Sequence, residues 1–225
     1  MLKSSNKSIT AGLFCALFLC LTILLLLVQV QPVGPNGSSV GFAGLNSGFF
    51  KLVGEHKSFY TLSKLLGYLA ILTVPFFAFL GLLQCIKGKS LAAVDRDILL
   101  LGIYYAVIAI LYLLFDKLIV INYRPVLEDG ELASSYPSTH ALLAVTLFGA
   151  AALQFGARLN DKKLRRIAVI CCRVFMGLTV IFRLLSGQHW LTDIIGGVLL
   201  GFALLYAYDA LRDQVLHSEQ SSSGE

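Results

Sequence analysis

The chain has 225 residues, of which 57% are hydrophobic and only 14% are charged, and its formal net charge is +5. A soluble globular domain is usually about 45–50% apolar and about 25% charged, so the composition excludes an ordinary soluble protein. The basic residues lie at the ends of long apolar runs, which favours membrane topology over a nucleic-acid surface as their explanation. The composition therefore indicates an integral membrane protein without a nucleic-acid partner.

Six apolar segments approach or reach the roughly 20 residues that a helix needs to cross a bilayer. They are residues 9–30, 62–86, 98–115, 138–157, 167–185 and 191–208. The first segment is longer than the apolar core of a signal peptide, which is about 7–15 residues, so we expect it to remain as a helix. We predict an all-α polytopic membrane protein with six transmembrane helices, forming a single domain over residues 1–225.

Two segments outside these spans allow separate predictions. Residues 31–60 are rich in glycine, and the stretch 40–53 within them carries five large apolar residues, Phe42, Leu45, Phe49, Phe50 and Leu52. This stretch is either a short amphipathic helix in the outer interface or an ordered loop, and the pattern does not decide between them. The polar, serine-rich tail 218–225 is predicted to be disordered.

Glycines are concentrated on one side of the sixth span. Gly196, Gly197 and Gly201 follow each other at helical spacing. Small residues let two helix backbones approach closely inside a membrane. We therefore expect this face of the sixth span to pack tightly against a neighbouring segment.

The lysines and arginines predict the orientation. With six spans, one side of the membrane carries Lys3, Lys7, Lys87, Lys89, Arg96, Arg158, Lys162, Lys163, Arg165, Arg166 and Arg212. The other side carries Lys51, Lys57, Lys64, Lys117, Arg124 and Arg183. Because cytoplasmic loops hold an excess of lysine and arginine, we expect the richer side and both termini to be cytoplasmic. Arg173 lies inside the fifth apolar run, and we favour a side chain that snorkels toward the cytoplasmic cluster over a functional role.

The opposite, outer side collects the residues that can perform chemistry. One outer loop and the start of the fourth span carry Lys117, Arg124, Ser138, Thr139 and His140, and the next outer loop carries Arg183, His189 and Asp193. His189 and Asp193 are four residues apart, so on a helix they share one face. A carboxylate there can bind one ring nitrogen of the histidine and leave the other free as a nucleophile or base.

This combination of residue types is suited to phosphoryl transfer. Lys117, Arg124 and Arg183 supply positive charge for phosphate oxygens. Ser138 can cap a helix whose first backbone N–H groups form an anion site. The outer loops carry no HExxH pattern and no cysteine–histidine set. We therefore expect a reaction without metal or cofactor, in which His189 attacks phosphorus to form a phosphohistidine and His140 donates a proton to the departing oxygen.

The same residues carry a resemblance to a known family. Lys117 with six residues before Arg124-Pro125, then Pro137-Ser138-Thr139-His140, then Arg183 with five residues before His189 and three more before Asp193, form three spaced motifs. They resemble the three-part signature of the type 2 phosphatidic acid phosphatase superfamily. The resemblance covers residues 117–193, about a third of the chain, and its six-helix plan extends to most of the remainder.

The resemblance implies a role for each matched position. Lys117, Arg124 and Arg183 would hold phosphate oxygens, and Ser138 with the N–H groups of the turn that includes Thr139 would complete the cradle. His189 would be the nucleophile, Asp193 its orienting partner, and His140 the acid and then the base for water. Two positions depart from the family pattern: Thr139 stands where glycine is usual, and Phe182 stands where serine usually precedes the third-motif arginine.

The implied function is a membrane lipid phosphatase with its site on the extracytoplasmic side. Its partners would be the bilayer and a lipid phosphate or pyrophosphate, such as phosphatidic acid, phosphatidylglycerol phosphate or undecaprenyl pyrophosphate. The sequence does not predict the oligomeric state. The main alternative is a lipid phosphotransferase that uses the same site. A second alternative is a non-enzymatic lipid-binding or transport protein. Transporters often contain paired internal repeats, and no internal repeat is evident in this sequence.

Overall fold

The computed structural model describes residues 4–222, which are mostly helical and contain no strand beyond isolated β-bridges. Within this described part, six helical segments are long and apolar enough to cross a membrane: Ser4–Leu27, Lys57–Gly88, Arg96–Leu118, Thr139–Arg158, Lys162–Leu185 and Leu191–His217. Each contains or overlaps one of the segments expected from the apolar runs. The prediction of an all-α protein with six transmembrane helices is therefore confirmed.

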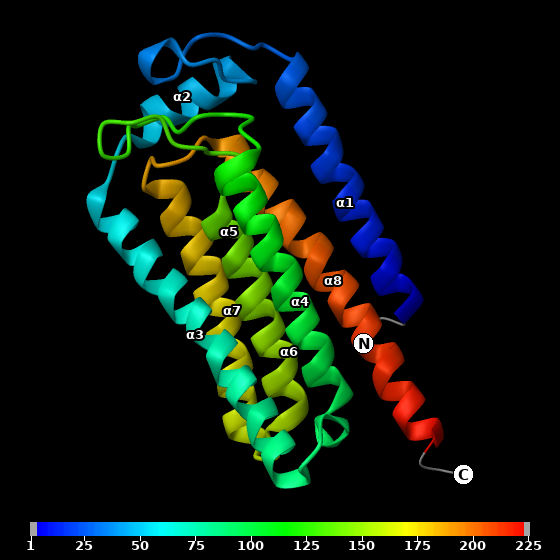
Figure 1. The fold of residues 1–225 in the computed structure, drawn as a ribbon. Coiled ribbons are helices and arrows are strands. Elements are labelled where there is room, and N and C mark those ends of the chain that lie inside the picture. Colours follow the sequence, from blue (N-terminus) through cyan, green and yellow to red (C-terminus); the bar gives the residue numbers. More distant parts are fainter. Residues whose placement is uncertain (1–3, 223–225) are drawn as a thin grey trace.

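The helices follow one another as shown in Figure 1. They are α1 (Ser4–Leu27), α2 (Ala43–Val53), α3 (Lys57–Gly88), α4 (Arg96–Leu113), α5 (Thr139–Leu143), α6 (Gly149–Arg158), α7 (Lys162–Leu185) and α8 (Leu191–Ser222). A π-helical turn, Leu114–Leu118, extends α4, and another, Ala144–Phe148, joins α5 and α6 into one continuous span. Short 3₁₀ turns occur at Pro35–Gly37 and Leu91–Ala93.

The α5–α6 span forms the centre of the bundle. In the 18-residue apolar stretch that identifies this span, 67% of the residues are buried, against 17–44% in the corresponding stretches of the other five spans. Helices α3, α4, α7 and α8 pack around it, and α1 packs along α8 on the outside (Figure 1). The central position of this span explains why its first residues, Ser138 to His140, are held by neighbours on several sides.

The glycine-rich face of α8 packs closely against this central span, as predicted. A Cβ atom on Gly197 would lie 2.5 Å from the carbonyl oxygen of Ser138, and one on Gly201 would lie 2.7 Å from Cβ of Val145. Real Cβ atoms do not come so near, so only glycine allows this approach. The contact fixes the start of α5 directly against the start of α8.

The stretch 40–53, for which the sequence left two alternatives, contains the helix α2, which lies across one end of the bundle (Figure 1). Asn46 is fully buried, and its amide nitrogen donates to Oγ1 of Thr192 at 2.9 Å. Its side-chain oxygen accepts from the backbone N–H of Thr192 at 3.2 Å. Because the first N–H groups of a helix have no partner within it, Asn46 caps α8 from outside and ties α2 to it.

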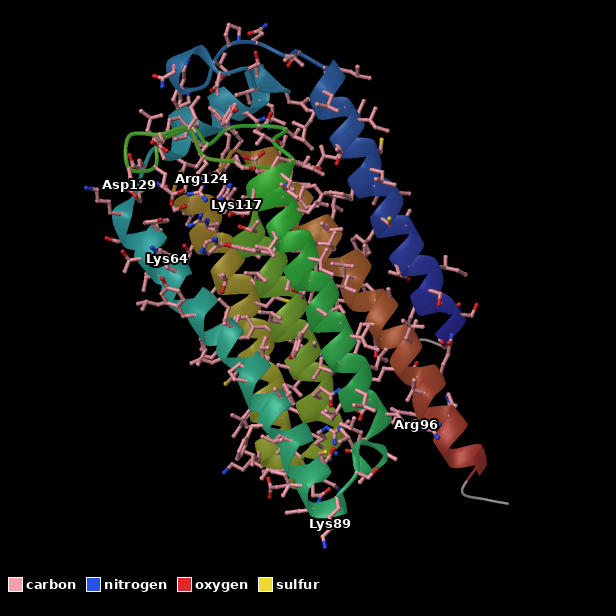
Figure 2. All side chains as sticks on the ribbon, viewed as in Figure 1. Lys64, Lys89, Arg96, Lys117, Arg124 and Asp129 are labelled. Carbon is pink, nitrogen blue, oxygen red and sulfur yellow. The ribbon has the colours of Figure 1, made fainter. Side chains whose placement is uncertain are left out.

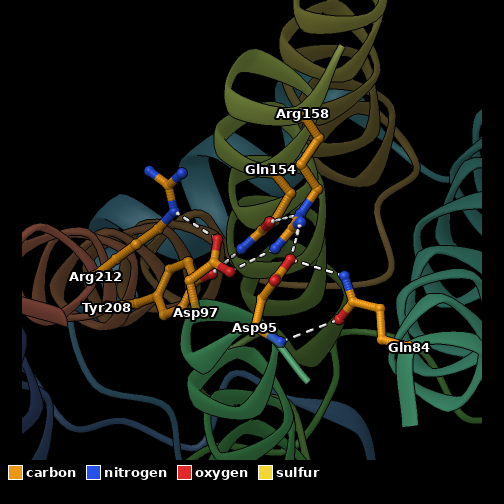
Figure 3. A network of polar contacts seen from close by, with 7 residues as sticks. All are labelled: Gln84, Asp95, Asp97, Gln154, Arg158, Tyr208 and Arg212. Atoms are coloured by element: carbon orange, nitrogen blue, oxygen red, sulfur yellow. Dashed lines mark hydrogen bonds and ion pairs between the residues drawn. The ribbon is translucent and has the colours of Figure 1, made fainter. Parts of the chain in front are cut away.

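At the opposite end of the bundle a polar network joins four helices (Figure 3). Arg158 at the end of α6 pairs with Asp95 at 2.6 Å and also with Asp97 of α4. Arg212 of α8 lies 3.6 Å from Asp97, and the amide of Gln84 in α3 donates to Asp95 at 2.8 Å. These contacts hold the helix ends together far from the site that the sequence predicts.

Two expectations for the C-terminal half stay predictions. The structure extends α8 to Ser222; the disorder expected for residues 218–225 stays a prediction, and residues 223–225 lie outside the described part. Arg173 is exposed on α7 and lines a cavity that also contacts Asp209 and Arg212; its snorkelling stays a prediction.

Candidate active site

Two loops meet at the end of the bundle that carries α2. The first connects α4 to α5 and carries Arg124; the second is the short turn between α7 and α8 and carries His189. Figure 2 shows Arg124, Lys117, Lys64 and Asp129 at this end, and Lys89 and Arg96 at the other. The chemistry-bearing residues of the two loops therefore lie at one end of the molecule.

His189 is almost completely buried, and both ring nitrogens have partners. Nδ1 lies 3.1 Å from the carbonyl oxygen of Ser135 and 3.0 Å from its Oγ, whereas Nε2 lies 3.0 Å from Nη2 of Arg183. A guanidinium can only donate, so Nε2 must accept and the ring proton is on Nδ1. This tautomer leaves the lone pair of Nε2 directed toward the arginine.

Asp193 acts on His189 through Ser135. The hydroxyl of Ser135 donates a short hydrogen bond to Oδ2 of Asp193 and lies next to Nδ1 of the histidine. Oδ2 also accepts from the backbone N–H of Trp190 at 2.9 Å, and Oδ1 accepts from the amide of Asn122 at 3.2 Å. The sequence predicted a direct contact between carboxylate and imidazole. The structure instead inserts Ser135 from the α4–α5 loop between them.

The environment of His189 favours its neutral form. Burial lowers the pKa of the imidazole well below its usual value, and the nearby positive charges of Arg183 and Arg124 lower it further. A neutral imidazole at physiological pH keeps the nucleophilic lone pair available. The lone pair of Nε2 is therefore available without prior loss of a proton.

Arg183 is fully buried, yet most of its guanidinium has no partner. Within residues 4–222, Nη1 and Nε form no hydrogen bond, and Nη2 lies 3.0 Å from the ring nitrogen Nε2 of His189. The guanidinium carbon lies 5.2 Å from the centre of the Tyr60 ring on α3, a cation–π contact. A buried arginine without a carboxylate is costly, so the site is arranged for an anion.

The two other expected cations differ in position. Arg124 is buried, with Nη1 2.7 Å from Glu128 and Nε donating to the carbonyl oxygen of Ser134 at 3.3 Å. Lys117 lies at the end of α4 with 72% of its side chain exposed, and it pairs with Asp116 at 2.9 Å. The structure therefore brings Arg124 into the buried group and leaves Lys117 at the surface, where it would have to turn inward to reach a ligand.

The start of α5 forms as the sequence indicates. Ser138 is the N-cap residue, and its Oγ accepts from the backbone N–H of Ala141 at 3.4 Å. Thr139 is buried in the first turn. Nδ1 of His140 is a buried atom without a hydrogen-bond partner among the described residues. An unpartnered imidazole nitrogen next to a buried arginine is a second sign that a ligand completes this site.

Phe182, which replaces the usual serine before Arg183, packs against the neighbouring helix. Its ring stacks on Phe59 of α3 with 5.7 Å between ring centres and 20° between ring planes. The position therefore contributes apolar packing between α3 and α7 in place of a hydroxyl group.

Several residues that contact His189, Asp193 or Arg183 were not predicted from the sequence. Ser135 precedes the second motif by two residues, Asn122 precedes Arg124 by two, and Tyr60 lies far upstream at the start of α3. Serine, asparagine and tyrosine are common in loops and helix ends, so no pattern distinguished them. Only the positions of Asn122 and Ser135 next to motif residues could have suggested a role.

An apolar cavity of about 520 Å³ opens beside His140. Its lining comes from α3, α4 and α5 and includes Lys64, Gly67, Tyr68, Ile71, Tyr105 and His140. Tyr68 and Ile71 are 57% and 46% exposed, so the cavity reaches the side of the bundle that would face lipid. A hydrocarbon chain can therefore lie beside the polar site without leaving an apolar environment.

The described residues offer no obvious metal centre. In residues 4–222, no group of three or more histidine, cysteine, aspartate or glutamate side chains is arranged to hold a metal ion. The side chains around His189 include Arg183, Arg124, Ser135 and His140, and the nearby carboxylate of Asp193 is already bound by Ser135, Trp190 and Asn122. Such a set is suited to holding an anion.

Comparisons with known proteins agree with this architecture. The family model described as the PAP2 superfamily matches residues 99–214, more than half of the chain. The fold is similar to a transmembrane PAP2-type phosphatidylglycerolphosphate phosphatase from Bacillus subtilis, with a TM-score of 0.57, 17% identity, and coverage of 91% of this chain and 96% of that chain. No curated protein sequence matches. The chain thus belongs to the PAP2 superfamily, the type 2 phosphatidic acid phosphatases whose three motifs it carries.

Proposed function

We propose that this membrane protein hydrolyses a lipid phosphate monoester or pyrophosphate through a phosphohistidine at His189, without a metal ion. The observation that carries the proposal is the fully buried Arg183, whose Nη1 and Nε have no partner in residues 4–222 and whose Nη2 touches Nε2 of His189. A phosphate group satisfies this arginine and at the same time comes into reach of the nucleophile.

The geometry supports the following sequence of steps. Phosphate oxygens bind Arg183 and Arg124, and Nη2 of Arg183 exchanges its contact with Nε2 for one with the phosphate. Nε2 of His189 then attacks phosphorus while Nδ1–H is held by the carbonyl oxygen of Ser135 at 3.1 Å. The bond from phosphorus to the leaving oxygen breaks, and His140 protonates that oxygen. His140 next takes a proton from water, which attacks the phosphohistidine and releases inorganic phosphate.

The backbone and the rim contribute further contacts to the anion. We expect the first N–H groups of the helix that starts at Thr139, capped by Ser138, to contribute to phosphate binding. Lys117 joins from the surface once it leaves Asp116. Both contributions supply positive potential where negative charge accumulates in the transition state.

A lipid is favoured as the substrate because of the apolar cavity next to His140. Its exposed edge at Tyr68 and Ile71 allows a lipid to enter from the bilayer with its chain still in apolar surroundings. Candidate substrates are phosphatidic acid, phosphatidylglycerol phosphate and polyprenyl pyrophosphates such as undecaprenyl pyrophosphate. The size of the cavity accepts one chain segment beside the site, which all of these provide.

The site is proposed to face the extracytoplasmic side, with both termini in the cytoplasm. The end of the bundle opposite the site carries the larger share of lysine and arginine, including Lys89 and Arg96 (Figure 2). The positive-inside tendency then directs that end to the cytoplasm. Labelling of single cysteines placed at residue 129 or at residue 89, with a reagent that does not cross membranes, tests the orientation: only the first should react in intact cells.

The central experiment measures phosphate release from a panel of lipid phosphates in detergent, with His189→Ala as the blank. We expect turnover of at least one candidate by the native protein and none by the variant. Retained turnover in His189→Ala would contradict the mechanism. The same assay in a metal chelator should be unaffected, and complete loss would indicate a metal enzyme. Appearance of a phosphorylated lipid acceptor in place of free phosphate would identify a phosphotransferase.

A further inference from the structure

Lys64 of α3 lies beside the site but outside all three signature motifs. It shares one face of the helix with Tyr60 and Gly67, four residues before and three after it. A Cβ atom on Gly67 would lie 3.5 Å from Cδ2 of His140, so this face of α3 is turned toward that histidine. Lys64 and His140 line the same cavity.

Tyr60 connects Lys64 to the anion site. Nζ of Lys64 lies 5.1 Å from the centre of the Tyr60 ring, and the guanidinium of Arg183 lies 5.2 Å from the centre of the same ring. Two cations from different helices thus approach one aromatic ring. Because aromatic faces attract cations, Tyr60 contacts both side chains and links Lys64 to the site of Arg183.

The charge of Lys64 has no carboxylate partner within the part of the chain that the structure describes. No ion pair of Lys64 occurs among the described side chains, whereas Lys117 pairs with Asp116 and Arg124 with Glu128. Lysine inside a membrane-crossing helix is expensive and usually marks a binding site or an ion path. An anionic group in the cavity would provide the missing partner.

The position relative to the two histidines indicates which part of a substrate Lys64 meets. In phosphoryl transfer the attacking and leaving atoms lie roughly in line on opposite sides of phosphorus. His189 attacks, and His140 serves the leaving oxygen. Lys64 lies with His140, and therefore on the side of the leaving group.

We infer that Lys64 binds the leaving phosphate of a lipid diphosphate, and that this site is selective for lipid diphosphates over lipid monophosphates. The inference rests on the proposed function and specifies its substrate class. In the step concerned, Nε2 of His189 forms a bond to the terminal phosphorus as the bond to the bridging oxygen breaks. The electron pair stays on that oxygen, and the lipid monophosphate leaves. Water then hydrolyses the phosphohistidine to inorganic phosphate.

The two substrate classes need different help at the leaving oxygen. A monophosphate ester departs as an alkoxide, which requires a proton, and His140 can supply it. A diphosphate departs as a phosphate anion with more than one negative charge, which a fixed cation stabilises directly. Lys64 adds little to the first reaction and much to the second.

The test compares two substrates with the same chain, farnesyl monophosphate and farnesyl diphosphate. Initial phosphate release gives kcat/KM for the native protein, Lys64→Gln and Lys64→Arg, with Lys57→Gln as a matched control at the exposed start of the same helix. We expect Lys64→Gln to lower kcat/KM for the diphosphate about 10- to 100-fold, the usual effect of losing a charged hydrogen bond. For the monophosphate we expect a change below about threefold.

The remaining variants make the outcome decisive. Lys64→Arg keeps the charge and should recover most of the diphosphate activity, and Lys57→Gln should change neither substrate. Equal losses on both substrates, or no loss on the diphosphate, would overturn the inference. Failure of the proposed function looks different, because the native protein would then release no more phosphate than His189→Ala from either substrate.

Discussion

Asp193 reaches His189 through the hydroxyl of Ser135, which donates to the carboxylate and lies 3.0 Å from Nδ1 of the imidazole. The backbone carbonyl of the same serine lies 3.1 Å from Nδ1. One residue of the α4–α5 loop therefore contacts the histidine twice, and only one of these contacts depends on its side chain. His189 and Asp193 both come from the third motif, but the residue that connects them comes from a different loop.

The double contact predicts a graded response to mutation. Ser135→Ala removes the bridge to Asp193 but leaves the carbonyl that holds Nδ1–H, so kcat should fall by only about 10- to 100-fold. Asp193→Ala should be worse and should also lower Tm, because buried donors from Ser135, Trp190 and Asn122 lose their acceptor. Steady-state kinetics and thermal unfolding in detergent measure both. A larger kcat loss in Ser135→Ala than in Asp193→Ala would contradict this arrangement.

The low pKa of His189 predicts the acid side of the pH profile. Burial and the charges of Arg183 and Arg124 favour the neutral ring, so protonation should begin only well below the usual value of about 6.5. After correction for ionisation of the substrate, kcat/KM should stay flat between about pH 7 and 6. Removing one cation with Arg124→Gln makes protonation easier, and the acid limb should move to higher pH. A limb near the ordinary histidine value in the native protein would argue against a neutral resting His189.

Glu128 offers a way to raise the affinity for anions. Its carboxylate pairs with Arg124 at 2.7 Å while 41% of its own side chain is exposed, so it competes with a phosphate for the same guanidinium. Glu128→Gln should lower the inhibition constant for inorganic phosphate by about two- to fivefold, a modest gain typical of a partly exposed pair. Glu131→Gln in the same loop serves as the control and should have no effect. Weaker phosphate inhibition in Glu128→Gln would mean that the glutamate positions Arg124 for binding.

The sequence predicted the six spans well because each depends only on a run of apolar residues, and the glycine face of α8 because its spacing is local. The candidate residues Arg124, His140, Arg183, His189 and Asp193 could be grouped because topology assigns their loops to one side. Contacts such as those of Ser135, Tyr60 and Lys64 could not be predicted, since they depend on how two loops cross and how α3 rotates about its axis. The exposed position of Lys117 could not be predicted either, because motif spacing does not specify the direction of a side chain.

Phe182 allows a test of whether the absence of the family's usual serine lowers the activity of this protein. Its ring stacks on Phe59 and packs α7 against α3. Phe182→Ser should therefore lower the free energy of unfolding by about 2–4 kcal/mol through lost packing, while activity at low temperature gains less than about twofold. Thermal unfolding and phosphate release on the same sample separate the two effects. A large gain in kcat would show that a hydroxyl at this position still contributes to the site.

The close approach of α8 to the start of α5 predicts that catalysis is sensitive to a single methyl group at a position outside the three signature motifs. A Cβ on Gly197 would lie 2.5 Å from the carbonyl oxygen of Ser138, whereas one on Gly102 of α4 would meet nothing within 4 Å. Gly197→Ala should push the capped helix start away from His189 and cost about 1–3 kcal/mol of stability. Gly102→Ala should leave stability within about 1 kcal/mol of the native value, in the direction of better helix propensity. Since displacement of the anion cradle by about 1 Å can cost 100-fold in rate, Gly197→Ala should lose activity even at temperatures where it is folded. Full activity in a folded Gly197→Ala protein would show that the helix start is not held in place by this contact.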